Sequence, residues 1–245
     1  MLVLPTEKTK SKVENIRFLI IYGKPKSGKT TLVAELENNL IIDLVGGSEY
    51  MNALSIQARS VEDLGEIANA ITAKIKETSK KPYKYITIDS ATVLEEISKP
   101  LALKLYQQTP MGKLYKDDIL KLPNGAGYMY VREAFDKIIT MFKNLCETLI
   151  LVGHCKDALI NKDGKEMSEM SLDLSGKLAR ITLASADAIG YCYRKKNETI
   201  ISFEGGEGTV REARALHLRG KKIVVAESDE NNNITFHMDR IFLPE

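Results

Sequence analysis

The stretch "IIYGKPKSGKTTLVAEL", residues 20–36, runs from apolar residues through a turn rich in glycine and lysine into an amphipathic segment. Gly23, Gly28, Lys29 and Thr30 match the pattern G-x-x-x-x-G-K-[ST]. Its glycines let the backbone curl so that several N–H groups point at one anion. Average residue frequencies give a chance match about once in a hundred chains of this length. The stretch therefore predicts a loop that binds the phosphates of a nucleotide.

The pattern also predicts what each residue of the loop does. Lys29 would reach the β- and γ-phosphates, and the hydroxyl of Thr30 would bind Mg²⁺. The expected nucleotide contacts are the consecutive residues Gly23, Lys24, Pro25, Lys26, Ser27, Gly28, Lys29, Thr30 and Thr31.

Strands and helices alternate on either side of this turn. Apolar stretches predict strands at 16–22, 40–45, 83–89 and 148–154. Helical periodicity predicts helices at 28–39, 60–80, 91–108 and 129–147, the second capped by Ser60 and the third interrupted at Pro100. The alternation indicates an α/β fold with a mainly parallel sheet covered on both faces. Short strands after residue 190 predict a C-terminal antiparallel β extension.

Two segments lack this periodicity. Residues 109–128 contain two prolines and three glycines, and residues 161–177 are polar and interrupted by glycines. Both are expected to be long loops, which in compact domains are more often functional than decorative.

The composition is that of an ordinary globular protein, with 44% hydrophobic and 28% charged residues and a net charge of +2. Charge alone therefore does not indicate a nucleic-acid-binding protein. Three cysteines without CxxC spacing favour a reducing compartment, and no apolar run approaches the ~20 residues of a membrane span, so a cytoplasmic protein is expected. We expect an N-terminal arm at 1–15 and one domain at 16–245.

Besides the hydroxyl of Thr30, an acidic residue is needed to help hold the metal. Asp89 ends the apolar strand "YITID", where the carboxyl edge of the sheet should face the phosphates. Asp89 could also cap the following helix. Candidates for orienting water are Asp43, Glu49, Glu95 and Glu96. His154 ends the fourth strand, either as a sensor of the γ-phosphate or as a structural residue.

The motifs "GKPKSGKTT", "YITIDSAT" and "LILVGHCKD", with the tail from Arg211 to Phe242, resemble RecA-type ATPases. More narrowly, the chain resembles phage nucleotide-binding ATPases linked to single-strand annealing. The resemblance implies a RecA-like core that hydrolyses ATP with Mg²⁺ and assembles into rings or filaments. It also implies single-stranded DNA as a partner in recombination or replication, with a single-strand-binding protein as a further one. A phage protein would work in the host cytoplasm.

The resemblance assigns residues to these roles. Lys29, Thr30 and Asp89 match the nucleotide and metal positions, and His154 matches the sensor position. The segments 109–127 and 161–177 fall where such proteins carry DNA-contacting loops, although surface loops or packing contacts would explain them too. Their basic candidates are Lys113, Lys116, Lys121, Lys162, Lys165 and Lys177, and the stacking candidates are Tyr115, Tyr128 and Tyr130. Arg214 is the best candidate for a basic residue that completes a neighbouring subunit's site, the alternative being a solvated turn.

One position departs from the resemblance. A glutamate near the end of the second strand commonly activates water in RecA-like chains, whereas "IDLVGGSE" has Val45 two places after Asp43. Either Glu49 or Glu95 substitutes, or turnover is slow.

Two alternative functions remain. One is a small-molecule kinase, although 155–180 holds only Arg180 as a candidate lid arginine. The other is a nucleotide-switched assembly protein. Met1–Pro5 could add a strand to a neighbouring subunit or form a disordered tail.

Overall fold

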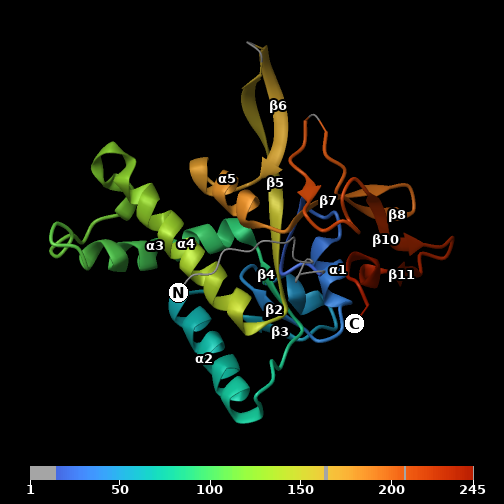
Figure 1. The fold of residues 1–245 in the computed structure, drawn as a ribbon, viewed down its shortest axis with the longest axis horizontal. Helices are drawn as coiled ribbons and strands as arrows, with labels where there is room; N and C mark the ends of the chain where they lie inside the picture. Colours follow the sequence, from blue (N-terminus) through green and yellow to red (C-terminus); the bar gives the residue numbers. More distant parts are fainter. Residues whose placement is uncertain (1–14, 163–164, 207, 245) are drawn as a thin grey trace, which may run out of the picture.

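Figure 1 shows the computed structural model, which describes residues 15–162, 165–206 and 208–244, with the side chains of 158–168 outside the description. The arm expected at 1–15, apart from Asn15, lies outside the described residues, as does its Met1–Pro5 strand.

The centre of the molecule is a parallel sheet with the order β7-β1-β5-β4-β2-β3. Its strands are β1 (Phe18–Gly23), β2 (Asn39–Asp43), β3 (Ser55–Gln57), β4 (Tyr85–Asp89), β5 (Thr148–Lys162) and β7 (Ala188–Lys195). Alternate residues of β1 enter opposite cores: Phe18 and Ile20 face one cluster and Leu19 and Ile21 the other. Strands buried on both faces are what a parallel sheet requires.

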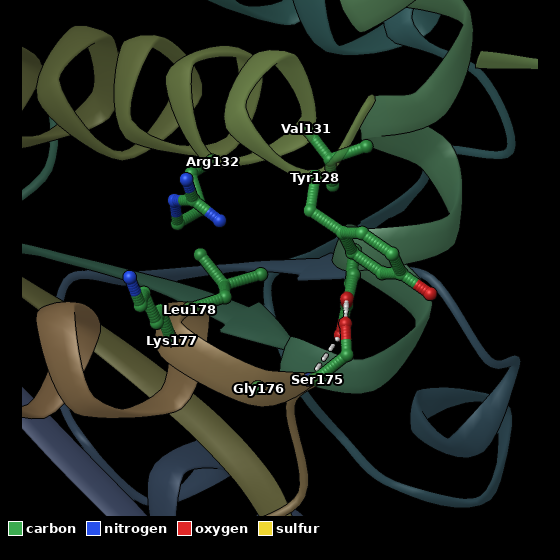
Figure 2. A pocket seen from close by; sticks show the side chains of 8 residues that line it. Tyr128, Val131, Arg132, Ser175, Gly176, Lys177 and Leu178 are labelled. Carbon is green, nitrogen blue, oxygen red and sulfur yellow. Dashed lines mark hydrogen bonds between the residues drawn. The ribbon is translucent and has the colours of Figure 1, made fainter. Parts of the chain in front are cut away.

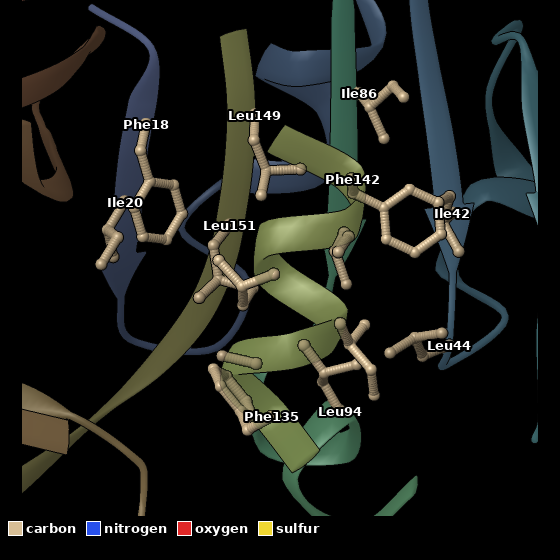
Figure 3. Close-up of a cluster of buried hydrophobic side chains, with 14 of the residues drawn as sticks. Phe18, Ile20, Ile42, Leu44, Ile86, Leu94, Phe135, Phe142, Leu149 and Leu151 are labelled. Atoms are coloured by element: carbon tan, nitrogen blue, oxygen red, sulfur yellow. The ribbon is translucent and has the colours of Figure 1, made fainter. Parts of the chain in front are cut away.

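Helices cover one face of this sheet. They are α2 (Val61–Thr78), α3 (Ala91–Gln107), α4 (Ala126–Leu145) and α5 (Gly176–Ser185). Figure 3 shows α4 lying along this face, with Phe135 and Phe142 pointing toward apolar side chains of the strands. The capping box expected at Ser60 is present, because the Ser60 hydroxyl and the Asp63 carboxylate each accept the other residue's N–H.

The short helix α1 (Lys29–Ala34) packs on the opposite face together with the C-terminal segment. That segment comprises β8 (Glu198–Ser202), β9 (Glu212–Ala213), β10 (Lys222–Ser228), β11 (Ile234–Phe236) and the 3-10 turn η4 (Met238–Ile241). The strands β8, β10 and β11 continue the sheet beyond β7 in antiparallel pairing. The predicted fold class, a mainly parallel sheet with a C-terminal antiparallel extension, is confirmed.

The segment 161–177 corrects the sequence analysis. It is not a loop: β5 continues to Lys162 and pairs with β6 (Lys165–Leu172) in a hairpin that projects from the body, and α5 begins at Gly176 (Figure 1). In residues 166–172, "EMSEMSL", the apolar residues Met167, Met170 and Leu172 do not recur at every second position, so the sequence resembles a polar loop.

Smaller corrections concern helix boundaries. Helix α1 ends at Ala34 instead of residue 39, and α3 passes through Pro100 without a break. Both sides of Pro100 are fixed by packing, since Leu94 and Ala102 belong to buried clusters. These tertiary contacts outweigh the helical hydrogen bond that proline cannot donate. The segment 109–128 is mostly loop but contains the turns η2 (Ile119–Lys121) and η3 (Pro123–Gly125) and the start of α4. The turn η1 (Gly47–Tyr50) follows β2.

Candidate nucleotide-binding site

The glycine- and lysine-rich turn connects the end of β1 to α1 as the pattern requires. Gly28 adopts φ 91° and ψ 8°, a left-handed conformation that favours glycine. The Lys29 ammonium folds into the turn and donates to the carbonyl oxygens of Gly23 (3.0 Å) and Lys24 (2.9 Å). Burial lowers the pKa of Lys29, while the carboxylate of Asp89 acts in the opposite direction. The turn therefore encloses a cation at its centre.

Thr30 and Asp89 meet beside this turn. The Thr30 hydroxyl donates to Asp89 Oδ2 at 2.6 Å, and Asp89 is 8% exposed. Burial raises the pKa of Asp89, and the hydrogen bond from Thr30 partly offsets this effect. A hydroxyl and a carboxylate in contact are oxygen donors of the kind that Mg²⁺ prefers.

His154 lies next to the turn on the neighbouring strand. It pairs in register with Gly23. It also lies close enough to Asp89 for a positive charge on the ring to lower the pKa of that carboxyl. Its Nδ1 atom is buried and has no hydrogen-bond partner among the described residues. Buried polar atoms are normally satisfied, so this nitrogen fits a partner supplied by a ligand, such as a phosphate oxygen.

These residues fit a nucleotide with Mg²⁺. In the described part of the chain, no three His, Cys, Asp or Glu side chains converge into a ready-made metal centre. Mg²⁺ does not need one, because it keeps several waters and takes one or two protein carboxylates together with substrate phosphates. Thr30 and Asp89 would hold the metal, and the residues of the turn would hold the phosphates.

The carboxylates considered for water activation are engaged elsewhere. Asp43 pairs in register with Asp89, but its two oxygens accept hydrogen bonds from Val45, Gly46 and Ser48. Glu49 is exposed on η1 and accepts from Gln57, and Val45 is itself exposed.

Glu95 is also bonded elsewhere, to Ser175 at the start of α5. Its Oε2 accepts from the Ser175 N–H at 2.9 Å and its Oε1 from the Ser175 hydroxyl. The described contacts thus bring neither Glu49 nor Glu95 to Asp89, because each is fixed by a different local partner. Sequence spacing could not show this, since Ser175 lies 80 positions after Glu95.

Strand β7 forms one wall of the turn, which the sequence analysis missed. A Cβ on Gly23 would lie 2.2 Å from the Cys192 carbonyl oxygen, and the Cys192 Sγ lies 3.8 Å from the Ser27 carbonyl oxygen. Burial raises the pKa of Cys192 to about 11, so its thiol stays protonated. No local motif marks this contact, because β7 and the turn are about 165 positions apart.

A hollow of about 340 Å³ lies between α4 and the start of α5 (Figure 2). Arg132 and Lys177 lie along one part of it, and Tyr128 lies near Ser175. Buried Glu95 also lines it. The hollow combines two cations with an aromatic ring.

The other candidates for nucleic-acid contact have different environments. Lys113 and Lys116 are exposed, and Lys121 forms an ion pair with Asp117 at 2.9 Å. Lys162 and Lys165 pair at the end of the hairpin, but their side chains lie outside the described residues.

Two of the tyrosines proposed for stacking pack on the protein itself. The rings of Tyr115 and Tyr130 lie 5.4 and 5.2 Å from the ring of Tyr106, in a small cluster that anchors the segment 109–128. Tyr128 is 44% exposed.

Arg214 is held within its own chain. Its guanidinium donates to the Ala184 carbonyl oxygen at 2.7 Å and lies 3.9 Å from an Asp187 carboxylate oxygen. The side chain remains two-thirds exposed, so a neighbouring subunit could still approach it.

The chain is similar to a known protein family and to solved structures. A family model described as an AAA domain matches residues 15–226. None of the curated proteins matches. Among solved structures, the crystal structure of the RadB recombinase aligns with 11% identity, a TM-score of 0.44 and 89% of each chain covered. In the described part of the chain, no helix is both long and apolar enough to cross a bilayer.

Proposed function

Because the chain belongs to the AAA domain family, we propose that it is a RecA-like ATPase that uses ATP and Mg²⁺ and binds single-stranded DNA as a homo-oligomer. Its role would be in recombination, annealing or replication. The proposal includes a narrower function like that of the phage ATPases linked to single-strand annealing. It also includes a single-strand-binding protein as a partner.

One observation carries the nucleotide part of the proposal: the Thr30 hydroxyl bonded to buried Asp89, beside a turn that encloses Lys29. Mg²⁺, when bound with ATP, would polarise the γ-phosphoryl group and offset its charge. Lys29 would leave the Gly23 and Lys24 carbonyl oxygens to contact phosphate oxygens. His154 would donate a hydrogen bond to the γ-phosphate or its water from a ring nitrogen.

The DNA part rests on two cations and an aromatic ring that line the same hollow. Lys177, Arg132 and Tyr128 surround the hollow beside α5, and the β5–β6 hairpin projects next to it (Figures 1 and 2). Phosphate contacts from basic side chains and stacking on an aromatic ring are how proteins hold single strands without sequence preference. Lys113 and Lys116 would extend this surface.

The oligomer part rests on Arg214, whose side chain is two-thirds exposed, and on the apolar sequence of Met1–Pro5. Arg214 would offset charge on a neighbouring subunit's γ-phosphate. The Met1–Pro5 segment would add a strand to a neighbour.

Lys29→Ala tests the proposal directly. We expect at least a tenfold loss of ATP affinity and the loss of any ATP-dependent change in single-stranded DNA binding, because the charge-assisted phosphate contact disappears. Fluorescent nucleotide titration and oligonucleotide anisotropy would measure both. Lys76→Ala, an exposed lysine of α2, is the matched control. Wild-type levels of ATP-responsive DNA binding in Lys29→Ala would overturn the proposal.

A second candidate, a nucleotide-switched assembly protein with little turnover, is favoured by the carboxylates. Val45 replaces the usual acid, and Asp43, Glu49 and Glu95 are each bonded to other groups. Tight ATP binding with ATP-dependent assembly and no phosphate release above background would support this candidate over the first. Light scattering combined with a phosphate-release assay separates the two.

A further inference from the structure

Arg194, near the end of β7, lies against the phosphate-binding turn. A Cβ on Gly28 would lie 3.2 Å from Arg194 Nη2 and 3.7 Å from its Nε, so the guanidinium covers the outer side of this glycine. Side chains on a strand alternate, and Cys192, two residues earlier, contacts Ser27 of the same turn. Cys192 and Arg194 therefore form one continuous row along the turn.

The guanidinium has no structural task that explains its position. The Arg194 side chain is exposed, and within the described ranges its guanidinium makes no hydrogen bond or ion pair. No carboxylate of the described residues lies within ion-pair distance of it. An arginine placed at a turn with only a glycine beneath it is available for an anion that binds there.

The sheet order indicates which end of the nucleotide Arg194 meets. Asp89 on β4 and His154 on β5 lie on one side of β1, and β7 lies on its other side. Thr30 and Asp89 would hold the Mg²⁺ that neutralises charge on the terminal phosphates, so these phosphates would lie toward β5 and β4. The α-phosphate and the nucleoside then lie toward β7.

We propose that Arg194 binds the α-phosphate of the nucleotide within the same chain and thereby adds affinity that ATP and ADP share. This inference rests on the proposed nucleotide-binding function. It separates two groups of residues: Lys29 and His154 would distinguish ATP from ADP, whereas Arg194 would not.

The experiment compares Arg194→Ala, Arg194→Lys and Lys195→Ala by titration with ATP and with ADP. Lys195 is the matched control, since it is the adjacent exposed cation and lies on the opposite face of β7. We expect Arg194→Ala to weaken ATP and ADP binding by the same factor, about 10- to 100-fold, as for a charge-assisted hydrogen bond. Arg194→Lys should recover part of this loss, and Lys195→Ala should remain within twofold of wild type.

The melting temperature without nucleotide separates binding from folding, and it should not change in Arg194→Ala because the side chain is exposed and unpaired. Wild-type affinity of Arg194→Ala for both nucleotides would overturn the inference and leave the proposed function standing. A loss confined to ATP would also overturn it, since Arg194 would then face the γ-phosphate. A wild-type protein that binds neither nucleotide would overturn both proposals.

Discussion

At the scale of single residues, two neighbouring carboxylates respond to their surroundings in opposite ways. Asp43 and Asp89 are paired in register on adjacent strands, and both are buried. Burial opposes the ionisation of Asp43, but hydrogen bonds from Ser48, Val45 and Gly46 together outweigh it and lower its pKa. Asp89 has one such donor, Thr30, and its pKa is raised. Asp43 therefore stabilises its turn as a carboxylate, whereas ionised Asp89 costs stability and is available for a metal.

Asp89→Asn replaces the buried carboxylate with a neutral amide. Because the pKa of Asp89 is raised in the folded state, protonated Asp89 stabilises the fold at low pH. This stability is lost as pH rises above about 3.9, the pKa of an aspartate in the unfolded chain. The neutral amide removes this loss, so the variant should melt higher at pH 7, by about 2–4 °C for each kcal/mol of relieved burial cost. The gain should shrink as pH falls toward 4, while Mg²⁺-dependent nucleotide binding is lost.

Melting curves between pH 4 and 8 check this prediction, with exposed Asp136→Asn as the control. A variant that is less stable than wild type at pH 7 would contradict it, because the Asp89 carboxylate would then be stabilising the fold.

At the scale of elements, a close backbone contact positions the first turn of α4. A Cβ on Gly127, in the first turn of α4, would lie 1.9 Å from the Ile119 carbonyl oxygen. This glycine lets α4 approach η2 and close the small cluster around Tyr106. Gly65, inside α2, has open space around its missing Cβ. The same substitution should therefore have opposite effects on the two helices.

Gly127→Ala should lower the free energy of unfolding by about 1–3 kcal/mol, as overpacking does. Gly65→Ala should raise it by about 0.5–1 kcal/mol, because alanine is the better helix former. Urea denaturation of both variants measures the two values. Equal destabilisation by both would show that α4 does not depend on the close contact with Ile119.

The elements also show what the sequence could and could not predict. The strand, turn and helix around Lys29 and the strand that ends at Asp89 followed from local patterns, because buried parallel strands are continuously apolar. The hairpin was missed because "EMSEMSL" is mostly polar and its apolar residues do not recur at every second position. Strand β3 was missed because it is three exposed residues long. Arg194 belongs to a basic run with Lys195 and Lys196, but that run does not show which cation reaches the turn, since only the pairing of β7 with β1 brings Arg194 there.

At the scale of the whole molecule, strand β5 connects the two surfaces of the proposed function. The nucleotide residues lie at the carboxyl ends of β1, β4 and β5, and β5 continues past them into the hairpin that projects from the body (Figure 1). Replacing 159–168 by a two-residue turn should therefore reduce affinity for single-stranded DNA by at least tenfold and leave ATP affinity within twofold of wild type.

Anisotropy with a labelled oligonucleotide and nucleotide titration of the same preparation measure the two affinities. Unchanged DNA affinity in the shortened protein would remove the hairpin from the DNA surface and leave the hollow beside α5 as its remaining site.

The unbroken course of β5 has a mechanical consequence. Its first half is clamped between two strands, His154 stands at the point where that clamp ends, and the remainder extends outward as a lever arm. The eight residues beyond His154 span about 26 Å, so a tilt of about 5° at this pivot would carry the far end through about 2 Å. Small displacements around a triphosphate would thus be magnified at the tip.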